Sequence, residues 1–205
     1  MNLKAYNIMK NTTYLVVVIG LSFFGCCKDK EPKITKIEEL SDEMTAYFVN
    51  YEVGTKWIYQ DTLNTNNLDT IELISKERFD IVSGDRNKGT LTKGFELYYK
   101  PSKSKDFKVR ITPGVDNNDF VKIDPMESGV AAISFEYKNN SWLPANFLDS
   151  IEITGNKYFE VIISPSSNSY FSRVSVSKMN GIIYYQSKVG GAINGCYKLI
   201  KTIKP

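Results

Sequence analysis

The sequence predicts an all-β protein in which one antiparallel meander sheet is strongly curled or forms a half-barrel, with a short N-terminal helix. Three observations favour this fold class. Short segments rich in β-branched and aromatic residues follow one another from about residue 51 to the end of the chain. Glycine–asparagine pairs, which favour hairpin turns, interrupt the last fifty residues at Gly155-Asn156, Asn180-Gly181 and Asn194-Gly195. Strands and helices do not alternate, as they would in a parallel sheet.

The first 25 residues have the pattern of a lipoprotein signal peptide. Lys4 and Lys10 form a basic start, and the run 14–25 that follows is uncharged and mostly apolar. This run is shorter than a typical transmembrane helix and has the length of a secretory core region. Gly25 before Cys26 resembles a bacterial lipobox, in which the cysteine becomes the lipidated N-terminus and carries fatty acyl chains such as palmitate. We expect lipid on Cys26, with Cys27 as the alternative site and an uncleaved N-terminal helix as the alternative to processing.

The stretch after the cysteines points to a compartment and to a division of the chain. Lys28, Asp29, Lys30 and Glu31 resemble the start of lipoproteins from the Bacteroidetes group, where such a stretch can act as a surface-export signal. The resemblance implies a lipid-anchored protein of the outer membrane at the cell surface, with the periplasmic face as the alternative. We expect a signal peptide over 1–25, a lipidated tether over 26–36 and a β-rich extracytoplasmic domain over 37–205.

The two ends of that domain carry a second resemblance. Gly54-x-x-Trp57-x-Tyr59 near its start and Ile183-Tyr184-Tyr185 near its end are similar to the opening and closing strands of uncharacterised Bacteroidetes lipoproteins. The resemblance implies structural motifs and transfers no catalytic residue. Five aromatic residues are therefore candidates either for the core or for a binding surface: Trp57, Tyr59, Trp142, Tyr184 and Tyr185.

Individual elements follow from spacing and turn signals. Thr35 and Glu38 have the form of a capping box, and apolar residues three to four positions apart predict a helix over about 36–47 that covers or flanks the sheet. Asn139–Phe147 is expected to be a long surface loop that contains Trp142. The expected strands cover 57–59, 70–75, 78–83, 95–100, 107–112, 120–123, 130–137, 151–154, 158–164, 170–178, 182–186 and 196–203.

The amino-acid composition limits the reactions and ligands that this chain can be expected to support. The chain has 26 Lys and Arg residues against 23 Asp and Glu residues. It therefore lacks the strong excess of positive charge that is typical of a nucleic-acid-binding protein. There is no histidine, the commonest general base and metal ligand, and the three cysteines are too few for a disulfide framework. We therefore expect no enzyme activity, no catalytic residue, no metal site and no cofactor.

Two surface features remain open. Asp61-Thr62-Leu63, Asp69-Thr70-Ile71 and Asp149-Ser150-Ile151 resemble the acceptor motif for O-glycosylation of exported Bacteroidetes proteins, although Asp-Thr is also ordinary at a strand start. Thr62, Thr70 and Ser150 would then carry glycan and face solvent. The segment 86–110 has eight basic residues against two acidic ones, so it could meet anionic headgroups or glycans, or form a solvated strand face.

Together these features predict a cell-envelope lipoprotein that acts as a non-enzymatic binding or surface-interaction module. Its partners would be the membrane, through the lipid, and a glycan or protein ligand. The alternative is a half-barrel that carries a small hydrophobic ligand, because a curled antiparallel sheet can enclose one. A binding module predicts exposed aromatic residues on a flat face or at loop tips, whereas a carrier predicts an apolar cavity between sheet and helix.

Overall fold

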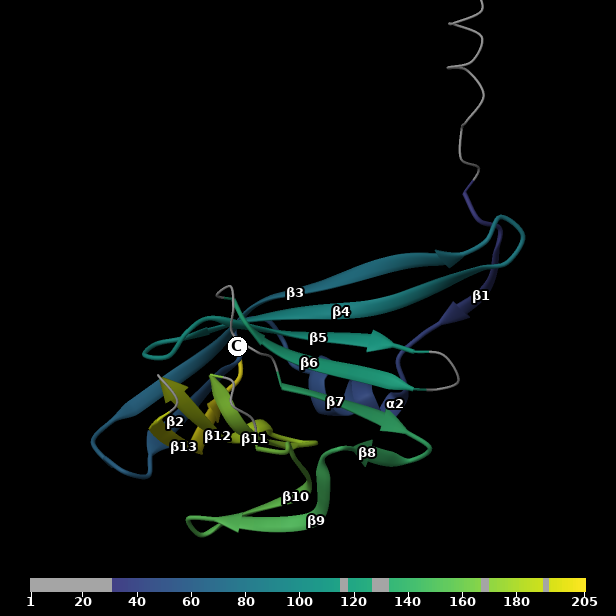
Figure 1. Cartoon of the computed structure of the whole chain (residues 1–205). Coiled ribbons are helices and arrows are strands. Elements are labelled where there is room, and N and C mark those ends of the chain that lie inside the picture. The colour runs from purple at the N-terminus through teal and green to yellow at the C-terminus, as the bar shows by residue number, and fades with distance from the viewer. Residues whose placement is uncertain (1–30, 115–117, 127–132, 167–169, 190–191) are drawn as a thin grey trace, which may run out of the picture.

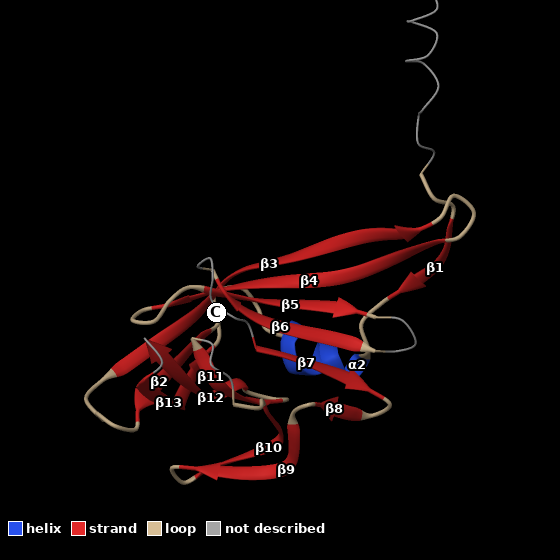
Figure 2. Ribbon diagram, in the orientation of Figure 1, coloured by secondary structure: helices blue, strands red, loops and turns tan. Residues whose placement is uncertain are grey.

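The computed structural model describes residues 31–114, 118–126, 133–166, 170–189 and 192–205. These residues form one sheet of 13 strands that curls almost into a barrel (Figures 1 and 2). The prediction of a single curled antiparallel sheet with a short N-terminal helix is confirmed. The strands are β1 (Ile34–Glu38), β2 (Lys56–Asp61), β3 (Leu68–Gly84), β4 (Gly89–Pro101), β5 (Phe107–Pro113), β6 (Asp119–Pro125), β7 (Ile133–Lys138), β8 (Ser141–Leu143), β9 (Asn146–Ile153), β10 (Asn156–Ile163), β11 (Phe171–Ser177), β12 (Gly181–Val189) and β13 (Ala192–Ile203).

The sheet follows the order of the chain around the barrel. Each strand from β2 to β8, and each from β9 to β13, pairs with the next one in antiparallel fashion, and β13 closes onto β2. The two ends of this order are β8 and β9, so the barrel is open between two strands that are consecutive in the chain. The exception to the meander is β1, which pairs in parallel with β4.

A helix fills the concave side of the sheet. It consists of α2 (Asp42–Met44) and a π-helical turn (Thr45–Val49), and Met44, Tyr47 and Phe48 are almost completely buried. In the strands, burial alternates from one residue to the next, as expected for a sheet with one face on the core. Tyr47 and Phe48 contact Trp142 edge-on, with ring centroids 5.1 and 6.5 Å apart. The helix is therefore part of the core and does not merely flank the sheet.

The predicted start of the helix was wrong. Thr35 and Glu38 lie in β1, and the Thr35 hydroxyl donates to the carbonyl of Gly89 instead of capping a helix. Ser41 is the actual N-cap, because its hydroxyl oxygen accepts a hydrogen bond from the Met44 amide. Residues 34–38 are extended because they pair with a part of β4 that β5 does not reach.

The expected loop over 139–147 was also wrong. It contains β8, whose Trp142 side chain points into the core and is 6% exposed. The two strands expected over 70–83 are a single strand, β3, 17 residues long. β3 pairs with β4 from Ile71 to Gly84, with one bulge at Ile74.

Two of the three glycine–asparagine pairs do mark hairpins. Gly181 has φ +71° where β12 begins after a three-residue turn, and Thr154 and Gly155 both have positive φ between β9 and β10. Asn194-Gly195, in contrast, lies inside β13. At Gly195 a side chain would collide with the Tyr197 ring, so this glycine permits a close approach within the strand.

The sheet has two different ends. The loops 62–67 and 102–106 lie at one end, which we call the loop end. At the other end β3 and β4 extend well beyond β5, and β1 runs beside them (Figure 1). We call this three-stranded extension, made of β1, residues 76–84 and residues 89–94, the arm.

Trp57 should be an energetic anchor of the core. Its side chain is 2% exposed, and its indole N–H donates to the Asn180 carbonyl over 2.8 Å. Trp57→Ala should lower the free energy of unfolding by about 3–5 kcal/mol. Chemical denaturation measures this, with Phe159→Ala as the control because Phe159 is 55% exposed. Equal denaturation midpoints for the two variants would contradict the assignment.

Candidate functional site

The structure resolves the role of the five aromatic candidates. Trp57, Tyr59, Trp142 and Tyr185 are all buried, with exposures of 2%, 1%, 6% and 1%. Their polar atoms bond inward: the Tyr59 hydroxyl donates to the Ile182 carbonyl over 2.7 Å, and the Tyr185 hydroxyl donates to Asp69. Only Tyr184 of this group faces outward, where it is half-buried. Four of the five are therefore core residues.

The space between helix and sheet leaves almost no free volume. Tyr47, Phe48, Trp57, Tyr59 and Tyr99 are among the side chains that line it, and the cavity there is about 10 Å³. A single water needs at least about 10–15 Å³ measured in this way. This part of the interior therefore gives no support to the carrier interpretation.

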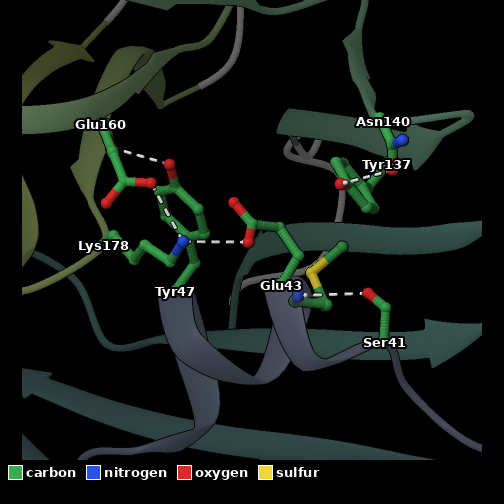
Figure 3. Close-up of polar contacts among 8 residues, drawn as sticks. Ser41, Glu43, Tyr47, Tyr137, Asn140, Glu160 and Lys178 are labelled. Carbon is green, nitrogen blue, oxygen red and sulfur yellow. Dashed lines mark hydrogen bonds and ion pairs between the residues drawn. The ribbon is translucent and has the colours of Figure 1, made fainter. Parts of the chain in front are cut away.

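A group of polar side chains converges beside the helix, close to the opening of the barrel (Figure 3). The Lys178 ammonium lies 3.0 Å from both the Glu43 and the Glu160 carboxylates and 5.9 Å from the centre of the Tyr47 ring. The hydrogen bonds that Lys178 donates to the two carboxylates raise the pKa of Lys178, and burial raises the pKa of Tyr47 above its ordinary range. The lysine is therefore held charged and the tyrosine neutral.

These contacts join the helix to the strands. The Tyr47 hydroxyl donates to the carbonyl of Glu160 over 2.8 Å. Glu160 has φ +48° within β10, an uncommon conformation for a residue with a side chain. Lys178 links this residue to Glu43 on the helix. Because each charge is bound to an opposite one, we interpret this group as a structural clasp and name Glu43, Tyr47, Glu160 and Lys178 the helix clasp.

A second buried network organises the loop end. Asp69 is fully buried, and its carboxylate accepts hydrogen bonds from the backbone N–H groups of Ser102 and Lys103 and from three hydroxyls. The hydroxyl donors are Ser102, Ser104 and Tyr185, at 2.8, 2.6 and 2.7 Å. A buried carboxylate is tolerated only when its oxygens are satisfied in this way. Asp69 therefore fastens the loop between β4 and β5 to the core.

The three Asp-Ser/Thr motifs lie in different surroundings. Thr62 is exposed in the loop after β2, whereas Thr70 on β3 and Ser150 on β9 are half-buried. Asp61, beside Thr62, is buried and accepts from the amides of Leu63 and Cys196. Thr62 fits the expectation of a solvent-facing hydroxyl best, and Asp61 and Asp69 have structural roles of their own.

The outer face of the sheet has an open groove across β5, β6, β7 and β8. Its volume is about 590 Å³. Phe120 contributes an aromatic ring that is 44% exposed, and Leu143 a side chain that is 45% exposed. Polar groups of both hydrogen-bonding kinds surround these apolar surfaces. The lining residues are Arg110, Thr112, Phe120, Val121, Lys122, Ser134, Phe135, Glu136, Leu143 and Pro144.

An ion-pair network fixes one side of this groove. Glu96 accepts from the Tyr98 hydroxyl at 2.6 Å and from Lys108 at 3.2 Å, and lies 3.6 Å from Arg110. These contacts, the Tyr98 hydrogen bond first, lower the pKa of Glu96, and the same bond raises the pKa of Tyr98 to about 12. The Arg110 guanidinium also stacks 4.5 Å from the centre of the Phe79 ring. The network therefore holds a cation at the groove wall in one orientation.

The same network accounts for part of the basic segment 86–110. Lys108 and Arg110 pair with Glu96, and Lys93 pairs with Glu39 at 2.9 Å. These residues form a solvated strand face with ion pairs rather than a patch of free positive charge.

A second groove of about 570 Å³ lies between β9 and the outer face of β11, β12 and β13. Tyr184, the outward-facing candidate, lies in its wall together with Arg173 and Lys198. Burial is the main cause that raises the pKa of Tyr184 to about 12, so its hydroxyl stays protonated at neutral pH. The sequence analysis did propose Tyr184 as a possible binding residue, and the structure gives it a place in a groove.

The residues of the first groove were missed by the sequence analysis. A signal was present, because Phe120 stands out of phase with Val121 and Ile123, which are the apolar inward positions of β6. An aromatic residue at an outward position is unusual enough to be noted. Which side chains accompany it depends on the pairing of β5, β6 and β7, which the sequence does not specify.

Comparisons with protein-family models, with curated proteins and with solved structures found no match to this chain. In the residues that the structure describes, no helix has the length and apolar character needed to cross a membrane. Cys26, Cys27 and the apolar run over 14–25 lie outside the described residues.

The Asp69 network gives a test of the loop end. Asp69→Ala should lower the free energy of unfolding by about 3 kcal/mol, because hydrogen bonds to a buried charged group are lost and their donors stay buried. Thermal or urea unfolding measures the change. Asp149→Ala is the matched control, because Asp149 begins the same type of motif but is exposed and should change stability by less than about 0.5 kcal/mol. Similar effects of both substitutions would contradict the role of Asp69.

Proposed function

We propose that this chain is a lipid-anchored lipoprotein of the cell envelope that binds a glycan in the outer groove of β5 to β8. It acts without enzymatic turnover, and it resides in the outer membrane, at the cell surface in preference to the periplasmic face. The observation that carries the proposal is the groove itself. An exposed Phe120 ring lies there among hydroxyl, carboxylate, ammonium and guanidinium groups.

The chemistry of the groove suits a carbohydrate. The apolar face of a sugar ring can lie on an aromatic side chain, while its hydroxyls need both donors and acceptors nearby. Phe120 offers the ring, Ser134 and Thr112 offer hydroxyls, and Glu136 offers an acceptor. Arg110 and Lys122 are ion-paired, with Glu96 at 3.6 Å and with Asp124 at 2.7 Å. Each keeps further N–H donors that an acidic sugar could use, so we expect acidic sugars to bind better than neutral ones.

The proposal of a binding role rather than catalysis has support from the charged groups. The chain contains no histidine. The convergent ionisable group closest to a catalytic constellation is the helix clasp, in which one lysine binds two carboxylates at 3.0 Å each. Its ammonium is thus occupied by the carboxylates, and neither partner is placed to exchange protons with a substrate in the groove.

The anchor is supported by the sequence features of the N-terminus: two lysines, an apolar run and Gly25-Cys26. Two or more acyl chains at one cysteine would hold the chain stably at a bilayer, whereas one chain binds only marginally. Thr62, which is exposed at the loop end, is the preferred O-glycosylation site among the three candidates.

The lipid site has a direct test. Cys26→Ala should abolish incorporation of a clickable fatty acid in cells, because in our proposal the Cys26 thiol forms the thioether to the lipid. Cys27→Ala serves as the matched control and should label like the unsubstituted chain. Loss of label only in Cys27→Ala would move the site by one residue, and an unlabelled wild-type chain would contradict the lipoprotein proposal.

The groove has an equally direct test. Native electrophoresis through gels that contain either polygalacturonate or dextran measures binding to an acidic and to a neutral glycan. We expect polygalacturonate to retard the protein more, and Phe120→Ala to weaken binding about tenfold, as the loss of one aromatic contact predicts.

Phe147→Ala is the control for this measurement. Phe147 is 45% exposed, about the same as Phe120, but lies on β9 outside the groove. Arg110→Gln should reduce retardation by polygalacturonate more than by dextran. Absence of retardation in both gels, or an equal effect of the two phenylalanine substitutions, would contradict glycan binding in this groove.

A further inference from the structure

The arm exposes a row of apolar side chains that has no partner among the described residues. Ile37, Leu91 and Val82 stand in register across β1, β4 and β3. Ile37 is 54% and Val82 is 50% exposed, and Leu91 is half-buried. We call these three residues the arm row. Apolar side chains that are scattered singly on a surface need no explanation, but a row across three strands does.

The arm row continues the inner face of the barrel. On β4, Leu91 has the same parity as Leu97 and Tyr99, whose side chains are buried in the core. The helix and the opposite strands cover those two residues but do not cover Leu91. Ile34, which is 39% exposed, lies at the tip beside Gly89 and extends the apolar surface toward the turn.

The chain enters the domain at the tip of the arm. The Lys33 amide donates to the Arg86 carbonyl over 3.2 Å, and the Gly89 amide donates to the Lys33 carbonyl over 2.9 Å. These bonds fix residue 33 to the turn between β3 and β4. Five residue steps lie between Cys26 and Glu31, and a fully extended chain covers at most about 3.6 Å in each, so about 18 Å in total.

This distance places the arm near the bilayer, an inference that rests on the proposed lipid anchor. A lipid on Cys26 holds that residue at the headgroup layer. The length of the tether therefore limits how far the tip can lie from the headgroup layer. Glu31 can be at most about 18 Å from Cys26, and the tip follows directly after Glu31. No other part of the domain is bound so closely to the point of attachment.

The charges around the tip also suit a lipid surface. Lys33, Arg86 and Lys88 are exposed there, and so is Lys36, whose ammonium pairs with Glu38 at 3.0 Å. Asp85 is turned into its own loop, where one carboxylate oxygen accepts from the amides of Asn87 and Lys88 at 2.9 and 2.8 Å. Basic side chains beside an apolar surface are the usual composition of segments that lie in a membrane interface.

We propose that the arm is a membrane-contacting element, which lays the arm row and Ile34 into the headgroup layer of the bilayer that carries the lipid anchor. The arm thus gives the domain a second attachment and a fixed orientation. At about 3.3 Å per residue, the 17 residues of β3 would span roughly 55 Å, and they run from the tip to the loop end. The loop end is thereby held away from the lipid surface.

Photo-crosslinking of the full chain in cells tests this. Three variants carry p-benzoylphenylalanine at position 82, at position 37 or, as the control, at position 63. Leu63 is 71% exposed but lies at the loop end. Mass spectrometry identifies what is attached after illumination. Phospholipid adducts at positions 82 and 37, with none at 63, are the expected result.

Other adducts would identify other occupants. A cross-link to a second copy of the chain, or to another protein, with no lipid adduct at 82 and 37 would overturn the proposal, as would equal lipid adducts at all three positions. Fatty-acid labelling of the same cultures shows independently whether the chain carries the lipid anchor. Label on the chain without lipid adducts refutes the arm alone, whereas lipid adducts without label refute the anchor and leave the arm contact in place.

Discussion

The filling of the barrel interior is the constraint on which the rest of this structure depends. The width of a closed or nearly closed sheet increases with its number of strands, and side chains from the strands alone fill only small barrels. Here the order of the sheet contains twelve strands, and the helix of residues 42–49 occupies the space that their side chains leave. The cavity between this helix and the sheet measures about 10 Å³, so this part of the interior has no room for a ligand. The proposed glycan groove and the proposed membrane contact lie on other surfaces of the sheet.

The open side of the barrel shows how the same helix replaces missing backbone pairing. Strands β8 and β9 end the sheet, so contacts of side chains must join its two edges. The rings of Trp142 on β8 and Tyr47 are 5.1 Å apart, and the Tyr47 hydroxyl in turn donates to the Glu160 carbonyl on β10. In the helix clasp, Lys178 adds ion pairs to Glu43 on the helix and to Glu160 on β10. The helix thus serves as the bridge between both edges, which explains why its aromatic face is buried so completely.

The sequence correctly predicts those strands and turns that depend on a local residue pattern. The prediction fails for segments whose structure is determined by pairing with distant parts of the chain. Alternation and the hairpin signal at Asn180-Gly181 are local, and they gave the curled antiparallel sheet correctly. Residues 34–38 have an acceptable helical spacing, but the free edge of β4 holds them as a strand. Trp142 has turn-forming neighbours, yet the helix offers its ring a buried site. The outer groove and the Asp69 network combine residues from three or more segments, and no spacing in one segment reveals them.

The arm is the place where the local rule and the global fold disagree most. On β4, Leu91 stands in phase with Leu97 although no layer lies above it, while Lys93 between them on the same face is paired with Glu39. If the residue pattern of each strand matched its exposure in the fold, exposed positions such as that of Leu91 would be polar. Mismatches between pattern and exposure are expected at functional surfaces. Two neighbours share this mismatch, because Val82 and Ile37 are aligned with Leu91 from strands on either side. The same row lies on the extension to which the tether is hydrogen-bonded at Lys33. This surface is apolar across three strands and lies where the chain enters the domain, which is why we propose that the arm contacts the bilayer.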